Sequence, residues 1–96
     1  MKYGLKESLI EELIGYAQKY DIEKLMIFGS RARGDYSERS DIDLAFWGGD
    51  ATNFILDVNE DTNTLLLFDI VDMSRPVQEE LKTSILSEGV VLYEKV

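Results

Sequence analysis

Residues 41 to 46 alternate between two kinds of side chain, and this alternation restricts the folds open to the chain. The apolar positions are Ile42, Leu44 and Phe46, and the positions between them are Asp41, Asp43 and Ala45. Because the side chains of a β-strand leave its two faces in turn, one face of a strand here would be buried and the other would carry both aspartates. The sequence therefore predicts a sheet that is packed on the side opposite two carboxylates.

Helical and extended patterns alternate along the remainder of the chain. Helices are expected over residues 6–20 and 51–60. A third helix is expected from Ser74–Pro76 to Gly89, with Val77, Leu81 and Ile85 on its inner face. Further strands are expected over residues 25–28, 65–71 and 90–93. The mostly apolar run 65–71 is typical of a central strand. With 96 residues and no linker or repeat, we expect a single α/β domain over residues 1–96, with a mixed sheet of about four strands flanked by helices.

Composition excludes several kinds of site. The chain has no cysteine and no histidine, so disulfides, thiolate metal sites and a histidine base are excluded, and any metal must be held by oxygen ligands. A net charge of −9 argues against direct binding of nucleic acid. No apolar run approaches the roughly 20 residues that cross a bilayer, and no signal segment is recognisable, so we expect a cytoplasmic protein without a membrane partner.

Asp41 and Asp43 form the first candidate site. Two residues apart on a strand, their side chains leave the same face and their Cα atoms lie roughly 6.5 Å apart. Two such carboxylates can converge on a pair of divalent cations, and without cations they would repel one another. The alternative interpretation is a solvent-exposed strand face on which the acids have no function.

A third carboxylate is expected from the apolar run 65–71. Asp69 interrupts this run, where an unpaired charge would be costly. If its strand lies beside the strand of Asp41 and Asp43, Asp69 joins the same site. Asp72 is the competing candidate, although it lies at the end of the strand, where an acid can cap the next helix.

Gly29 and Ser30 follow a short apolar run and provide a candidate phosphate site. Glycine lets the backbone approach a ligand closely, and the amides of a following helical turn together with the serine hydroxyl can bind an anion. Arg31 and Arg33 could add positive charge for a polyphosphate. The spacing matches neither a P-loop nor G-x-G-x-x-G, so a simple turn is the alternative interpretation.

Gly29-Ser30, followed after ten residues by Asp41-Ile42-Asp43, resembles the signature of the DNA polymerase β-like nucleotidyltransferases. The fuller pattern, GSRARG with SDIDL, is similar to that of the minimal nucleotidyltransferase (MNT) domains of bacteria and archaea. The resemblance implies the polymerase β-like nucleotidyltransferase fold. It also implies two Mg²⁺ ions (or Mn²⁺) held by Asp41, Asp43 and Asp69, and a triphosphate held at Gly29 and Ser30. It also extends to three weaker candidates for nucleotide binding, which are Arg31, Arg33 and Ser40. For Arg33 the alternative is pairing with a nearby acid, and for Ser40 it is shaping of the loop.

The same resemblance implies an activity and a partner. MNT domains are typically paired with helical HEPN-domain proteins in toxin–antitoxin modules, which implies transfer of AMP from ATP to a hydroxyl, expected to be that of a tyrosine, of a HEPN toxin. A nucleotidyltransferase that modifies a small molecule with a second subunit, and an antitoxin that only binds, are the alternatives. A homo-oligomer is also compatible with the sequence. Trp47 could stack on a base, but packing or an interface is the preferred interpretation.

Overall fold

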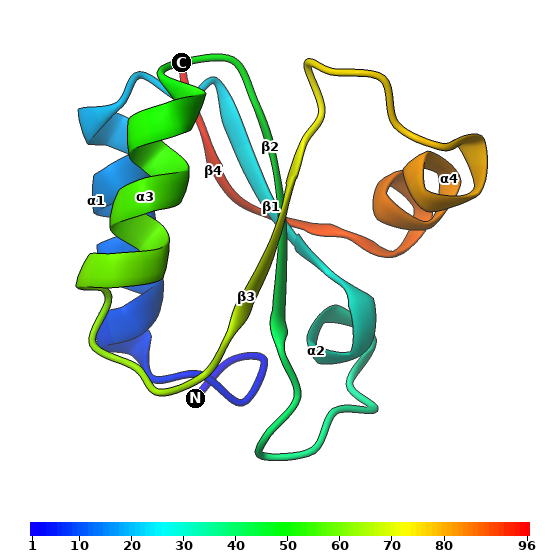
Figure 1. Cartoon of the computed structure of the whole chain (residues 1–96). Helices are drawn as coiled ribbons and strands as arrows, with labels where there is room; N and C mark the ends of the chain where they lie inside the picture. The colour runs from blue at the N-terminus through cyan, green and yellow to red at the C-terminus, as the bar shows by residue number, and fades with distance from the viewer.

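Four strands form one mixed sheet in the computed structural model, which describes residues 1–96 (Figure 1). The strands are β1 (Lys24–Phe28), β2 (Ile42–Trp47), β3 (Phe68–Asp72) and β4 (Val90–Glu94). Their order in the sheet is β3-β2-β1-β4, with β1 antiparallel to both β2 and β4 and with β2 parallel to β3. The predicted α/β class and mixed four-stranded sheet are confirmed.

Four helices cover the two faces of this sheet. They are α1 (Glu7–Lys19), α2 (Gly29–Arg33), α3 (Ala51–Asp61) and α4 (Glu79–Glu88). Helices α1 and α3 lie together on one side of the sheet, and α2 and α4 lie on the other (Figure 1). None of them is long and apolar enough to pass through a bilayer.

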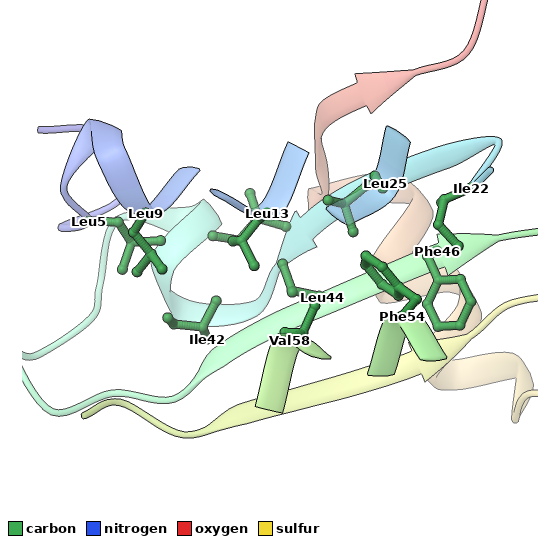
Figure 2. Packing of buried hydrophobic residues seen from close by; sticks show 12 residues of the cluster. Leu5, Leu9, Leu13, Ile22, Leu25, Ile42, Leu44, Phe46, Phe54 and Val58 are labelled. Carbon is green, nitrogen blue, oxygen red and sulfur yellow. The ribbon is translucent and has the colours of Figure 1, made fainter. Parts of the chain in front are cut away.

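The main core lies between the sheet and the pair α1 and α3 (Figure 2). Ile42, Leu44 and Phe46 of β2 are fully buried there, and the Phe46 ring lies 5.0 Å from that of Phe54 on α3. Side chains at alternate positions must then leave the opposite face of the sheet. Core packing on one side therefore turns Asp43 towards the side of α2 and α4.

The side of α2 and α4 is packed much more lightly. Its buried cluster consists of Phe28, Ala45 and Ile85, with partly buried residues around it. Helix α2 has only five residues, and α4 buries a single side chain, Ile85. On this face Met26, Phe28 and Ala45 are buried, whereas Asp43 is half-buried and Asp69 is exposed.

Two expectations about the second half of the chain were wrong. Strand β3 is an edge strand rather than a central one, and it begins at Phe68, so that Leu65 and Leu67 are exposed. The last helix begins at Glu79 rather than near Ser74, and Leu81 is exposed. Ser74 instead closes the turn after β3: its amide donates to Asp72, and its hydroxyl accepts from the amide of Gly48.

Candidate active site

The pairing of β2 with β3 places two of the predicted carboxylates side by side. Asp43 is the direct partner of Asp69 across the parallel pair, so both side chains leave the same face of the sheet. Asp41 precedes β2 by one residue and shares the parity of Asp43. The three aspartates thus gather where β2 and β3 begin, on the side of α2.

Gly29 closes this site from the neighbouring strand. Phe28, the last residue of β1, pairs with Asp43, so that Gly29 lies beside the Asp43 carboxylate. Gly29 has a φ of +73°, and a Cβ atom at this position would collide with that carboxylate. Both the backbone conformation and the close approach require glycine here.

The electrostatics of Asp43 reflect this crowding. Its carboxyl is half-buried, and burial raises its pKa above the ordinary value for an aspartate; Asp69 and then Asp41 raise the pKa further by charge repulsion. Arg33 and Arg31 oppose the shift. A divalent cation between these carboxylates would relieve the same repulsion.

Asp72, the competing candidate for the third carboxylate, lies apart from this group. It pairs with Phe46 at the far end of β3 and has the parity of Phe68 and Ile70, which pack on the core side. Its carboxylate accepts from the amide of Ser74 at 2.9 Å and lies 3.6 Å from the Arg75 guanidinium. Asp72 therefore serves the turn after β3, and Asp69 is the acid beside Asp43.

The structure corrects the prediction for Arg31. This side chain is 1% exposed and faces the protein interior, where it donates to backbone carbonyls of Tyr3, Gly4, Glu38 and Ser40. Every N–H of the guanidinium is used in these bonds, so none is left for a phosphate. No sequence pattern indicates this role, because backbone carbonyls distant along the chain have no residue-type signature.

Arg33 and Ser40 have protein partners in this structure. Arg33 contacts Asp35 at 3.3 Å and Glu88 of α4 at 2.9 Å, which links α2 to α4 in the manner of the structural alternative. The Ser40 hydroxyl accepts from the amide of Ser37 at 2.9 Å and so closes the loop before Asp41. Arg33 and Ser40 could contact a nucleotide only if these solvent-exposed hydrogen bonds were broken and replaced by bonds to the nucleotide.

The three aspartates lie on an open surface rather than in a pocket. Hollows in the surface are found elsewhere: the one that contains Trp47 lies near Leu86, and two others lie around the start of α1. Trp47 is half-buried, with the Lys24 ammonium 5.3 Å from its ring, at the opposite end of β2 from Asp43. This supports packing rather than base stacking for Trp47.

Comparison with known families agrees with this geometry. Residues 11–96 match the family described as Polymerase beta, Nucleotidyltransferase. The chain belongs to this nucleotidyltransferase family. The match includes β1, Gly29-Ser30, the Asp41–Asp43 segment and β3, so it covers every element that forms the site.

Individual relatives of this nucleotidyltransferase are consistent with that assignment. The chain is 35% identical over 100 residues to the Methanocaldococcus jannaschii protein named "Putative protein adenylyltransferase MJ0604", covering 92% of this chain and 98% of the relative. A mutant of the toxin–antitoxin MntA-HpeT superposes with a TM-score of 0.67 at 18% identity, over 90% of this chain and 73% of the other. A toxin–antitoxin structure with AMP-PNP gives 0.64 at 22% identity, over 95% and 75%. The solved structures share the fold.

The donor set of this nucleotidyltransferase fits a hard divalent cation. Asp41, Asp43 and Asp69 offer only oxygen ligands, which Mg²⁺ and Mn²⁺ accept, and the absent Cβ of Gly29 leaves space beside Asp43. As the side chains stand, no three acidic groups are close enough to surround an ion. Binding of an ion by all three residues would therefore require the exposed Asp41 and Asp69 side chains to turn towards Asp43.

Proposed function

We propose that this chain transfers AMP from ATP to a hydroxyl group, that of a tyrosine, on a cognate toxin of the HEPN class, and that it acts as the antitoxin of the pair. The observation that carries the proposal is the placement of Asp43 beside Asp69, against a glycine that leaves room for a ligand. The name of the 35% identical relative, a protein adenylyltransferase, supports the kind of reaction. The toxin–antitoxin structures of the same fold, one of them with AMP-PNP, support the kind of partner and nucleotide.

The chain's own residues divide the work between holding the nucleotide and receiving the acceptor. Asp41, Asp43 and Asp69 are the residues that would hold two Mg²⁺ ions, and the triphosphate would lie at Gly29, which is beside Asp43, and at Ser30, the next residue. Bound Mg²⁺ supplies positive charge to the phosphates and lowers the pKa of an acceptor hydroxyl. Asp43 must be ionised for this, so its raised pKa makes the site sensitive to acid.

Asp69 is best placed to meet the acceptor. It is exposed on the edge strand β3, whereas Asp43 on the neighbouring strand is half-buried. The acceptor oxygen forms a bond to the α-phosphorus, the bond from this phosphorus to the bridging oxygen breaks, and pyrophosphate leaves. Asp69 can orient the hydroxyl and take up its proton as the oxygen attacks.

The absence of a hollow at the three aspartates means that a second protein must complete the acceptor site, either as the acceptor itself or as a subunit that binds a small acceptor. None of the hollows in the surface contains Asp41, Asp43 or Asp69, so this chain has no cavity in which to enclose a small acceptor beside them. A side chain that projects from another protein can reach an open ledge without such a cavity. The acceptor protein would then itself form the missing wall of the site.

The proposal is tested by labelling the HEPN-type protein encoded next to this chain. Purified chain, Mg²⁺ and ATP labelled on the α-phosphate are expected to label that protein, and Asp69→Asn is expected to reduce the rate by about 10²-fold or more. Asp72→Asn is the matched control, since it removes an acid from the same strand but away from the site, and it should label at the wild-type rate. Equal labelling by the two variants would contradict the role of Asp69, and absence of labelling by wild type would favour an antitoxin that only binds.

A further inference from the structure

The buried guanidinium of Arg31 joins three segments that are distant in sequence. Its Nη1 donates to the carbonyls of Tyr3 at 2.9 Å and Gly4 at 3.4 Å, in the turn before α1. Its Nη2 donates to the carbonyls of Glu38 at 3.2 Å and Ser40 at 2.9 Å, and Nε donates to Ser40 at 3.1 Å. The start of the chain, helix α2 and the loop before β2 therefore meet at one side chain.

The surroundings of this guanidinium are built to enclose it. The Tyr36 ring lies 5.1 Å from the central carbon of Arg31 and covers it from the loop side. Gly4, at a φ of +68°, leaves the space that both groups occupy, because a Cβ there would overlap the Tyr36 ring and lie 2.8 Å from Nη1 of Arg31. A buried charge is costly unless its hydrogen bonds are made, so loss of these acceptors would be felt strongly.

Two of the five bonds end on the carbonyl of Ser40, the residue before Asp41. The Ser40 carbonyl and the Asp41 amide belong to one planar peptide unit. Fixing the carbonyl oxygen by two donors therefore fixes the orientation of the peptide that leads into Asp41. Asp41 itself lies outside β2, whose first residue is Ile42, so the sheet does not hold it directly.

We propose that Arg31 is a positioning residue for the metal site: it orients the Asp41 carboxylate through the Ser40 carbonyl and makes this orientation depend on the chain segment that contains Tyr3 and Gly4. The inference rests on the proposed function, in which Asp41 binds the metal. It assigns to Arg31 no contact with the nucleotide. Residues that orient a metal ligand typically change metal affinity or activity by about 10- to 100-fold when they are replaced.

The test measures the site without requiring nucleotide transfer. Hydrogen exchange of the 36–42 peptide reports the order of the loop, and titration with Mn²⁺ in the presence of a non-hydrolysable ATP analogue reports the metal site. Arg31→Ala is expected to speed exchange in this peptide and to weaken Mn²⁺ binding about 10-fold or more. Guanidinium at millimolar concentration is expected to restore much of the Mn²⁺ affinity, because it can refill the same planar site.

Three further variants separate positioning from folding. Gly4→Ala disturbs the Arg31 site from the other end of the network, and Arg31→Lys keeps the charge but loses the planar set of donors. Both are expected to weaken Mn²⁺ binding while the chain stays folded, so they carry the test if Arg31→Ala does not fold. Arg39→Ala is the matched control: it removes an exposed positive charge one residue from Ser40, and it should leave exchange and Mn²⁺ affinity unchanged.

The outcomes distinguish this inference from the proposed function. If wild type binds Mn²⁺ and folded Arg31 and Gly4 variants bind it equally well, the inference is wrong and the proposed function is untouched. If wild type fails to bind Mn²⁺ with the analogue, the proposed function is contradicted and the inference with it. Weak Mn²⁺ binding in the Arg31 and Gly4 variants alone, with recovery on addition of guanidinium, is the result that supports it.

Discussion

Asp43 is the residue at which the requirements of folding and of the proposed reaction conflict. It is half-buried, it lies beside Asp69, and the nearby Asp41 adds further negative charge. Groups arranged in this way destabilise the folded chain when no cation is present, and they bind a cation strongly for the same reason. The cost of keeping Asp43 ionised should therefore be measurable in the metal-free protein.

Asp43→Asn is expected to raise the melting temperature of the metal-free chain at pH 7. Because the pKa of Asp43 is higher in the folded chain than in the unfolded one, its favourable contribution to stability is complete below the ordinary aspartate pKa and is lost as the pH rises through the raised value. The advantage of the asparagine variant should thus shrink as the pH falls through that range. Thermal melts in EDTA across this pH range make the measurement.

The control for the Asp43→Asn melts is a second aspartate that has favourable contacts. Asp72→Asn removes an acid that contacts the Ser74 amide and Arg75, so it should melt at or slightly below the wild-type temperature. Asp43→Asn should in addition abolish stabilisation of the chain by Mn²⁺. An Asp43→Asn chain that melts below wild type in EDTA at pH 7 would show that Asp43 is not under electrostatic strain.

Alanine variants at Gly29 and Gly34 separate the effect of the close approach to Asp43 from the effect of the backbone conformation. Both have positive φ, +73° and +96°, so alanine at either position should cost roughly 1–2 kcal/mol of unfolding free energy. Only at Gly29 does the new Cβ collide with Asp43, since a Cβ at Gly34 meets no atom within 4 Å. Gly29→Ala should therefore also lose Mn²⁺ binding, whereas Gly34→Ala should keep it.

Calorimetric melts and Mn²⁺ titration of these two variants provide the comparison. Equal Mn²⁺ affinity in both would mean that the space beside Asp43 has no function in metal binding. A loss of affinity in both would instead point to the conformation of α2 as a whole, because Gly29 begins this helix and Gly34 caps its end.

The aspartates could be predicted from the sequence because the alternation that places them is local. A period of two in residues 41–46 is enough to put Asp41 and Asp43 on one face, and an acid in an apolar run is conspicuous at Asp69. The role of Arg31 could not be predicted in the same way. Its partners are carbonyls of residues up to 28 positions away, and only the folded chain brings them together.

Strand β2 is the element on which both halves of the molecule depend. One face supplies Ile42, Leu44 and Phe46 to the main core, and the other presents Asp43 to solvent and ligand. Because its two neighbours are β1 and β3, it also aligns Gly29 with Asp69. Register errors in this strand would move every one of these side chains to the wrong face.

Replacement of Phe54 on α3 measures how much the core between β2 and α3 contributes to the free energy of unfolding. Phe54→Ala removes a fully buried ring that lies against Phe46, and it should lower the free energy of unfolding by about 3–5 kcal/mol. Leu56→Ala changes a half-exposed side chain of the same helix and should stay within about 0.5 kcal/mol of wild type. Urea denaturation measures both, and similar losses would contradict the assignment of the core to the α1 and α3 side.

Element boundaries and neighbours were predicted less well than element types. The order of strands in a sheet depends on long-range pairing, so the apolar run before Asp69 could not reveal that β3 lies at an edge. Ser74 and Pro76 form a plausible helix start by residue type, but Ser74 bonds to the turn after β3 instead. One of these bonds is local, to Asp72, and the other is tertiary, from Gly48, and neither begins a helix.

The main core lies on the side of α1 and α3, and the candidate active site lies on the other side of the sheet, with α2 and α4 (Figure 1) and a smaller buried cluster. The net charge of −9 would favour approach of a positively charged partner. The chain carries the candidate nucleotide site but no hollow beside it that could enclose an acceptor. We therefore assign acceptor binding to a second protein, to which AMP would pass from ATP.

The most direct test compares ATP labelled on the α-phosphate with ATP labelled on the γ-phosphate. Each is mixed with the wild-type chain, Mg²⁺ and the neighbouring HEPN-type protein, and label on each protein is measured after denaturing electrophoresis. Nucleotidyl transfer predicts that the HEPN-type protein gains the α-label only, while the γ-label is released as pyrophosphate. Transfer of the γ-label, or no transfer of either label, would show that the chain does not transfer AMP to this protein.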